Sequence, residues 1–213
     1  MTIRVFLADD HALMRDGLKA LLQVAGDIVV VGEVGTGREA VRLVPELKPD
    51  VLLMDIAMPE LNGIDAARTL REKCPETRIV IVSMHATSEH VFRALEAGAA
   101  GYLLKESAGT EVVAAVRAVH AGNRYLSRAA SEAVQHRSER GGTASPLDSL
   151  STRERQVLQL VVEGKSSAEI ARMVHLSPKT VETYRSRLMK KLGVNDIPSL
   201  VRLALQHGIT PPG

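Results

Sequence analysis

Five short apolar runs recur along the first half of the chain, and segments with apolar residues at helical spacing lie between them. The runs begin at residues 3, 28, 51, 79 and 101 and read IRVFLA, IVVVGEV, VLLM, IVIV and GYLL. Strands that are apolar on both faces and alternate with helices indicate a parallel sheet covered by helices on both sides. We therefore expect a doubly wound, flavodoxin-like α/β fold with five parallel strands in the order 2-1-3-4-5.

The second half has a different pattern and is expected to form a small all-α domain with four helices. The N-caps of these helices are expected at Ser151, Ser166, Ser177 and Asp196. The second and third helices are separated by only a few residues, which is typical of a helix-turn-helix. Between the two halves, residues 128–149 are rich in small and charged residues and are expected to be a linker that is helical in part. The expected domains are 1–127 and 150–213.

Charge and composition narrow the classes of function. Residues 1–127 carry 14 Lys and Arg against 17 Asp and Glu, whereas residues 128–213 carry 13 against 8, so the second half is the basic one. A basic domain is compatible with a nucleic-acid partner, but the lack of Trp argues against stacking on single strands. The single cysteine, Cys74, excludes an internal disulfide. No apolar run approaches the length of a membrane span, so we expect a cytoplasmic protein without a membrane partner.

Three acids are expected to meet at one edge of the predicted sheet. Asp9 and Asp10 follow the first strand and Asp55 follows the third, and these two strands are neighbours in the expected order. Taken singly, each acid could cap the helix that follows it. Taken together, three close carboxylates repel one another unless a cation binds between them, and an all-oxygen site of this kind suits Mg²⁺.

Two further residues should reach the same edge of the sheet, because Ser83 ends the fourth strand and Lys105 follows the fifth. A metal ion and an ammonium can neutralise the oxygens of a phosphoryl group, and a hydroxyl can donate a hydrogen bond to it. Asp55 is the expected nucleophile, since it ends the central strand. The first half therefore predicts a site at which an aspartate is phosphorylated.

The first half resembles the receiver domain of two-component response regulators. The matching motifs are the pair DD at residues 9 and 10, LLMDIAMPELNG around Asp55, IVIVSMH around Ser83 and GAAGYLLKES around Lys105. One departure is Glu106, which stands where many receivers have Pro. The resemblance implies that Asp55 accepts a phosphoryl group from a sensor histidine kinase.

The same resemblance assigns roles to the other residues of the expected site. It implies that Mg²⁺ is bound by Asp10, Asp55 and the backbone carbonyl of Ala57, with indirect help from Asp9. It also implies that Ser83 and Tyr102 form a switch pair, in which Ser83 turns toward the phosphoryl group and Tyr102 moves inward, and that Lys105 binds the phosphoryl group.

The second half resembles the helix-turn-helix module of the LuxR, NarL and FixJ class, over the stretch LSTRERQVLQLVVEGKSSAEIARMVHLSPKTVETYRSRLMKKLGV. In the helix that begins at Pro178, polar residues recur every three or four positions and share one face. These residues are Lys179, Glu182, Thr183, Ser186, Arg187 and Lys190. Val181, Leu188 and Leu192 lie elsewhere on the helix and are expected to pack on the core.

The resemblance implies that this helix binds in the major groove of double-stranded DNA. The residues expected to read base edges are Glu182, Thr183 and Ser186. Those expected to contact the DNA backbone are Lys179, Thr180, Tyr184, Arg185 and Lys190. Tyr184 stands where many members of the class have His. The two resemblances together imply a transcription regulator, not an enzyme, whose phosphorylation controls DNA binding and the formation of a homodimer.

Three other functions fit parts of the sequence less well. A phosphatase of the haloacid dehalogenase type would also use Asp55 as the nucleophile, but such enzymes usually have a second acid two residues later, where this chain has Ala57. A dehydrogenase is suggested by GTGREA, residues 35–40, yet this motif follows the second strand and not the first. A receiver that dimerises without being phosphorylated would not need the complete set of acids, Ser83 and Lys105.

Overall fold

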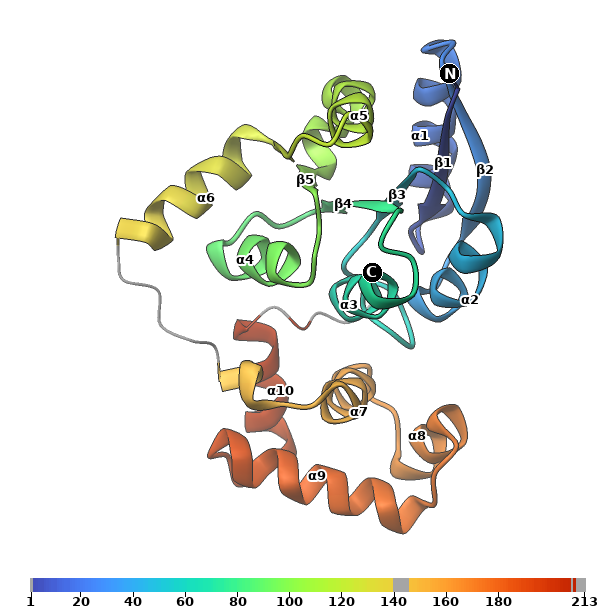
Figure 1. Cartoon of the computed structure of the whole chain (residues 1–213). Coiled ribbons are helices and arrows are strands. Elements are labelled where there is room, and N and C mark those ends of the chain that lie inside the picture. Colours follow the sequence, from blue (N-terminus) through green and yellow to red (C-terminus); the bar gives the residue numbers. More distant parts are fainter. Residues whose placement is uncertain (1, 140–145, 208, 210–213) are drawn as a thin grey trace. The chain divides into compact units, whose positions relative to one another are not determined.

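The computed structural model of the chain describes residues 2–139, 146–207 and 209 (Figure 1). The described residues divide into a first unit, 2–139, and a second unit that begins at residue 146. Each unit has its own buried apolar core.

The first unit alternates strands and helices along the chain, as its apolar runs predict. Its strands are β1 (Ile3–Ala8), β2 (Ile28–Val34), β3 (Val51–Met54), β4 (Arg78–Ser83), β5 (Gly101–Leu104) and β6 (Tyr125–Leu126). Its helices are α1 (Ala12–Val24), α2 (Gly37–Leu47), α3 (Gly63–Lys73), α4 (Ser88–Glu96), α5 (Lys105–His120) and α6 (Arg128–Glu139). The strands are parallel and lie in the order β2-β1-β3-β4-β5-β6, which confirms the predicted order of the first five.

Successive residues of the strands point to opposite faces of the sheet and build two separate layers of core. In β1, Val5 and Leu7 belong to the cluster that packs under α1 and α5. Phe6 and Ala8 belong to the cluster that packs under α2, α3, α4 and α6. Because helices cover both faces, all four residues of the central strand β3 are apolar and buried, and this is why the strands appear in the sequence as continuous apolar runs.

The sixth strand is the part of the sheet that the sequence analysis does not predict. β6 has only two residues, too few to form an apolar run, and it pairs with β5 so that Tyr102 lies opposite Leu126. The chain then enters α6, where Ala130 is fully buried in the core of the first unit. Residues 128–149, which the sequence assigns to a linker, therefore contain a helix that packs on the first unit.

Helix α2 begins where the chain passes close to the loop between β3 and α3. A Cβ atom at Gly37 would lie 2.0 Å from the carbonyl oxygen of Leu61, so the backbone approach requires glycine. Thr36 caps the helix by accepting a hydrogen bond from the amide of Glu39 at 3.2 Å. The motif GTGREA is thus explained by the start of a helix and by close packing.

The second unit is all helical. Its elements are the short 3₁₀ helix η1 (Pro146–Ser149) and the helices α7 (Thr152–Val162), α8 (Ser167–Val174), α9 (Pro178–Leu192) and α10 (Ile197–Gln206). All four predicted N-caps accept a hydrogen bond from the amide three residues later, as expected for Ser151, Ser166, Ser177 and Asp196. Helix α8 ends at Val174, its C-cap His175 has the left-handed conformation, and α9 begins after Ser177, so a short turn joins the two helices. In the described ranges, no helix has the length and apolar character needed to cross a membrane.

Candidate functional site

Neighbouring strands bring two acids to the same edge of the sheet. β1 pairs with β3 up to Ala8, so Asp9 and Asp55, which follow these strands, are neighbours. The amide of Asp55 donates to the carbonyl of Ala8 at 2.8 Å, and the amide of Asp9 donates to the carbonyl of Val34 at 3.1 Å. Both carboxylates are almost completely buried, with 3% of each side chain exposed.

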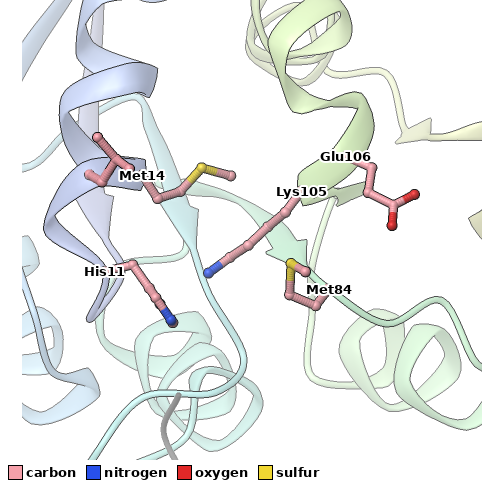
Figure 2. Close-up of a pocket in the computed structure, with 6 residues that line it drawn as sticks. His11, Met14, Met84, Lys105 and Glu106 are labelled. Carbon is pink, nitrogen blue, oxygen red and sulfur yellow. The ribbon is translucent and has the colours of Figure 1, made fainter.

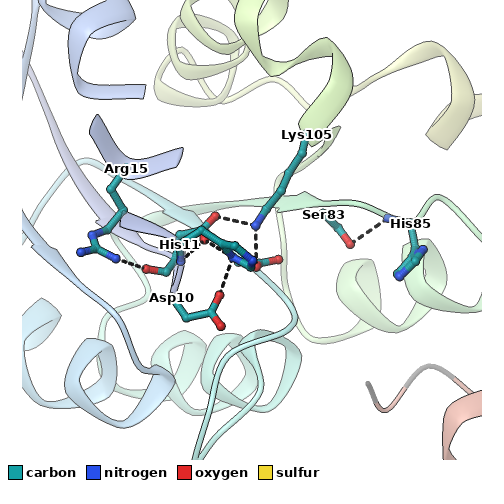
Figure 3. A network of polar contacts seen from close by, with 8 residues as sticks. Asp10, His11, Arg15, Ser83, His85 and Lys105 are labelled. Carbon is teal, nitrogen blue, oxygen red and sulfur yellow. Dashed lines mark hydrogen bonds and ion pairs between the residues drawn. The ribbon is translucent and has the colours of Figure 1, made fainter. Parts of the chain in front are cut away.

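Lys105 bridges these two buried carboxylates (Figure 3). It lies directly after β5, and its Nζ is 2.8 Å from Asp9 Oδ2 and 2.7 Å from Asp55 Oδ2. The Lys105 side chain is itself 8% exposed. The ends of three different strands therefore supply the two anions and the cation, as the sequence predicts for Asp9, Asp55 and Lys105.

Burial and pairing act in opposite directions on the ionisation of this cluster. Burial raises the pKa of Asp55, and the ammonium of Lys105 offsets this only in part. Burial alone would lower the pKa of Lys105, but the carboxylates of Asp55 and Asp9 outweigh it, so this pKa is raised. Asp55 is therefore a carboxylate for which a second nearby cation would stabilise the ionised form.

Asp10 reaches the cluster through His11, a residue that the sequence analysis does not single out. His11 Nδ1 is 2.7 Å from Asp10 Oδ1 and 3.1 Å from Asp9 Oδ1, and the His11 amide donates to Asp9 Oδ1 at 2.9 Å (Figure 3). Arg15, also missed, donates from Nη1 to the backbone carbonyl of Asp9 at 2.6 Å. The available signal was local, because His11 directly follows the acid pair and Arg15 lies one helical turn further on.

The donor atoms of this cluster fit a bound divalent cation. One ligand atom each from Asp9, Asp10, His11 and Asp55 lies within 4.8 Å of the others. Three carboxylates supply the hard oxygen ligands that Mg²⁺ prefers. The ammonium of Lys105 supplies positive charge beside Asp9 and Asp55.

The loop that leaves Asp55 packs tightly against the backbone of Asp55 itself. A Cβ atom at Gly63 would lie 1.9 Å from the carbonyl oxygen of Asp55, and the Gly63 amide donates to the carbonyl of Ile56 at 2.9 Å. Pro59 accepts a hydrogen bond from the amide of Leu61 at 2.8 Å. The backbone amide of Ala57 donates to the Asp55 carboxylate, which lowers the pKa of Asp55 against the effect of burial. The turn residues of this stretch thus fix the backbone on both sides of Ala57.

Ser83 and Tyr102 form a second polar group beside the carboxylates. The Ser83 hydroxyl accepts a hydrogen bond from the His85 amide at 3.2 Å, and the Tyr102 hydroxyl donates to the His85 carbonyl. Tyr102 is fully buried, and this burial raises the pKa of its hydroxyl. Among the described residues, Ser83 makes no hydrogen bond to Asp55. The side chain of Tyr102 is therefore already buried, while the hydroxyl of Ser83 is hydrogen-bonded to the loop after β4.

A pocket of about 490 Å³ opens beside Lys105 (Figure 2). Its lining is largely apolar and comes from the start of α1, the loop after β4 and the start of α5. The lining residues are His11, Leu13, Met14, Met84, Lys105 and Glu106. Leu13 and Met84 are exposed, so an approaching molecule would meet apolar side chains before it reached Lys105.

In the second unit, the polar face predicted on α9 is open to solvent. All six of its residues are exposed: Lys179, Glu182, Thr183, Ser186, Arg187 and Lys190. Val181, Leu188 and Leu192 are buried in the core of the second unit, as predicted. Tyr184 is partly buried and packs against the same core. The helix therefore separates a polar outer face from an apolar inner face.

Several side chains of α9 are engaged within the second unit. Thr180 is hydrogen-bonded to the N-cap Ser177, with 2.8 Å between the two hydroxyl oxygens. The Thr183 hydroxyl donates to the backbone carbonyl of Lys179 at 3.0 Å. Arg185 Nη1 donates at 2.6 Å to the hydroxyl of Ser167, a residue of α8 that the sequence analysis does not single out.

Comparison with known protein families identifies two domains in the chain. Residues 5–117 match the response regulator receiver domain, and residues 148–204 match the luxR family of bacterial regulatory proteins. The transcriptional regulatory protein MctR of Rhizobium johnstonii is 41% identical over 208 residues, which cover 97% of this chain and 95% of MctR.

Two solved structures are similar over most of the chain. One is RcsB from Salmonella enterica serovar Typhimurium bound to a promoter in the presence of the phosphomimetic BeF3−; it has 26% identity and a TM-score of 0.62, and covers 95% of this chain and 98% of that chain. The other contains two RcsB dimers bound to two parallel DNAs; it also has 26% identity and a TM-score of 0.62, and covers 98% of this chain and 100% of that chain.

The fold and the acidic cluster define a regulator with an α/β receiver unit and a helix-turn-helix unit. The chain belongs to the two-component response regulators with a LuxR-type DNA-binding domain. Its relatives are transcription regulators and not enzymes, so the phosphatase and dehydrogenase interpretations are set aside. We refer below to the first unit as the receiver and to the second as the DNA-binding unit.

Proposed function

We propose that Asp55 is the residue at which this response regulator is phosphorylated. The observation that carries the proposal is the ion pair between Lys105 and the carboxylates of Asp9 and Asp55, because it puts a cation beside the oxygen that would attack phosphorus. An Asp55 oxygen forms a bond to phosphorus while the bond from phosphorus to the donor breaks, and the donor leaves with the electron pair of that bond. Lys105 then balances the charge on the transferred phosphoryl group.

We further propose that Mg²⁺ is bound by Asp10, Asp55 and the backbone carbonyl of Ala57, with Asp9 acting indirectly. The cluster of carboxylates and the fixed loop around Ala57 support this set. When bound, Mg²⁺ would supply positive charge to the phosphoryl oxygens. Asp9 keeps its pair with Lys105, so its role is to position that ammonium.

The switch is proposed to consist of Ser83 and Tyr102. A phosphoryl group on Asp55 offers new acceptor oxygens, and the Ser83 hydroxyl can turn toward them away from His85. Tyr102 is tied to the same loop through the His85 carbonyl, and its backbone carbonyl accepts from the amide of Ser127 at 2.9 Å. Ser127 directly precedes α6, so this hydrogen bond connects Tyr102 to the start of the linker.

The phosphodonor is proposed to be a sensor histidine kinase, and the output to be binding of double-stranded DNA. The proposed domains are 1–127 and 150–213, with the linker at 128–149. A homodimer, at least when phosphorylated or bound to DNA, is supported by the RcsB structure that contains dimers on DNA. A regulator of this kind must reach chromosomal DNA, which supports a cytoplasmic location.

The DNA-contacting residues are proposed to lie on α9. Glu182, Thr183 and Ser186 are the base-reading residues, and their exposure supports this role. The backbone-contacting residues are proposed to be Lys179, Thr180, Tyr184, Arg185 and Lys190.

The phosphorylation proposal is tested with radiolabelled acetyl phosphate. The parent protein should take up label in the presence of Mg²⁺, and Asp55→Asn should not, because an amide oxygen is a poor nucleophile. Asp50→Asn is the matched control, since it changes an acid at the opposite end of the same strand and should label like the parent. Labelling of Asp55→Asn at the parent level would overturn the assignment.

A second measurement tests the link between the receiver and DNA. The full-length protein is sized and titrated with DNA, with and without beryllofluoride, which mimics a phosphoryl group on Asp55. We expect beryllofluoride to tighten DNA binding and favour a dimer, and Asp55→Asn to abolish both responses. Identical size and affinity in both conditions would contradict phosphorylation control.

A further inference from the structure

The DNA-binding unit contains a polar contact between α8 and α9 that the proposed function does not use. Ser167, the first residue of α8, donates its hydroxyl hydrogen to Glu182 Oε1. The hydroxyl oxygen of Ser167 in turn accepts a hydrogen bond from Arg185 Nη1 at 2.6 Å. One hydroxyl can act once as a donor and once as an acceptor in this way, so both bonds form together. Arg185 Nη1 is also 3.7 Å from Glu182 Oε1, which closes the triangle.

The side chain of Glu182 is held in one orientation by Ser167 and Arg185 although it is exposed to solvent. Its side chain is 62% exposed, whereas that of Arg185 is 19% exposed. An exposed glutamate on a helix normally samples several rotamers, and fixing it in one of them has an entropic penalty. Here Ser167 and Arg185 hold one carboxylate oxygen before any ligand binds. The other oxygen, Oε2, has no hydrogen-bond partner among the described residues and remains available as an acceptor.

The preceding serine, Ser166, has a different role. The contact of Ser167 with α9 is therefore not part of the N-terminal cap of α8. Ser166 caps α8 by accepting from the amide of Glu169, and its hydroxyl donates to Glu169 Oε2 at 2.6 Å. The start of α8 therefore needs only Ser166. Ser167 lies one position later, and its hydroxyl reaches the neighbouring helix.

We propose that Ser167 is a positioning residue for sequence recognition, which orients Glu182 so that its second carboxylate oxygen accepts a hydrogen bond from the amino group of a cytosine in the major groove. A carboxylate suits this group because cytosine presents its N4 amino donor there. A preset Glu182 discriminates better than a mobile one, since a mobile carboxylate could adjust to other partners. The inference rests on the proposed base-reading role of Glu182.

The experiment is selection of binding sites from randomised duplexes by the full-length protein and its variants. Glu182→Ala should lose the preference at the base pair that Glu182 reads, by about tenfold or more. Ser167→Ala should lose preference at the same base pair, by about three- to tenfold, and leave the other positions unchanged. Ser167→Thr keeps the hydroxyl and should restore the parent preference. The double variant should be no less selective than Glu182→Ala alone, because both changes remove one recognition contact.

The outcomes separate this inference from the proposed function. Uniform weakening of all sequences by Ser167→Ala, with the base preference intact, would overturn the positioning role. If Glu182→Ala alters the preference and Ser167→Ala does not, the inference fails while Glu182 remains a base reader. If Glu182→Ala leaves every preference unchanged, the base-reading assignment fails, and the inference fails with it.

Discussion

Charged side chains are used in opposite ways at the two sites of this protein. In the receiver, Asp9 and Asp55 are 3% exposed and share Lys105, so each charge depends on the others. On α9 of the DNA-binding unit, the basic residues Lys179, Arg187 and Lys190 are exposed and make no ion pair with another described residue. Buried charges require partners, whereas exposed charges do not. The two sites should therefore respond differently when one charge is removed.

Removal of Lys105 should have the largest effect. Lys105→Met keeps the aliphatic stem but leaves two buried carboxylates without their cation, and we expect the receiver to lose about 3–5 kcal/mol of stability in the absence of Mg²⁺. Lys190→Met, the matched change on α9, should alter the stability of its unit by less than about 0.5 kcal/mol. Backbone amide hydrogen exchange in β3 and in α9 measures the two effects separately in the full-length chain.

The stability of both variants should also be measured with added Mg²⁺. If a divalent cation binds the cluster, it should restore a substantial part of the stability of Lys105→Met, because it replaces the missing positive charge. It should leave Lys190→Met unaffected. A loss of stability for Lys105→Met no larger than that for Lys190→Met would show that the buried pair does not matter to the receiver.

A methyl group added at Gly63, the first residue of α3, should have the next largest effect. Gly63→Ala places a Cβ atom 1.9 Å from the carbonyl oxygen of Asp55, so the backbone must move, and we expect a loss of about 1–3 kcal/mol. Gly17→Ala in α1 is the control, since its Cβ would meet no atom within 4 Å; it should stabilise by up to about 1 kcal/mol. Hydrogen exchange in β3 reports both changes. Equal stability of the two variants would exclude close packing at Gly63.

The buried carboxylate of Glu154 in the DNA-binding unit should give a smaller effect that depends on pH. Burial acts to raise the pKa of Glu154, but hydrogen bonds from Lys191 and Ser151 outweigh it and hold the pKa below its ordinary value of 4.5. A lowered folded-state pKa means that this stabilisation is present above about pH 4.5 and is lost as the pH falls through the folded-state value. Glu154→Gln should therefore lower stability by about 1 kcal/mol at pH 7, and the difference should shrink in acid.

Urea unfolding followed by the methyl NMR signals of Leu158 and Leu188, both in the core of the DNA-binding unit, measures this dependence. A difference between the parent and Glu154→Gln that stayed constant from pH 7 to pH 3 would mean that the Glu154 pKa is not lowered by folding. Glu169 and Asp196 also have lowered pKa values. The comparison with Glu154→Gln isolates Glu154, because those two acids are common to both proteins.

The sequence predicts different features of the two sites, because one lies at the edge of a sheet and the other on the face of a helix. Strand order and the apolar runs suffice to bring Asp9, Asp55 and Lys105 together, since residues at the ends of parallel strands share one edge. The sequence pattern does not reveal their partners His11 and Arg15. The contacts of these two residues depend on how the chain enters α1. β6 was missed because two residues form no pattern.

On α9 the helical period separates exposed from buried residues correctly, as shown by Val181 and Leu188. The period does not reveal the contact of Ser167 with α9, since Ser167 lies on a different helix and no periodic pattern relates it to Glu182. Contacts within one element or along one sheet edge can thus be predicted from the sequence. Contacts between side chains of different helices depend on packing angles that a sequence pattern does not contain.

The smallest expected effect concerns Lys190 on DNA. If its ammonium contacts a phosphate, DNA binding by Lys190→Met should release one counterion fewer than binding by the parent. The slope of log affinity against log salt concentration should then flatten by about 0.9. Binding should weaken equally for all sequences, because phosphates are the same at every base pair. Glu182→Ala is the matched comparison on the same face of α9, and it should alter base preference while leaving that slope no flatter. A change of base preference in Lys190→Met, with an unchanged slope, would mean that Lys190 reads bases and does not contact a phosphate.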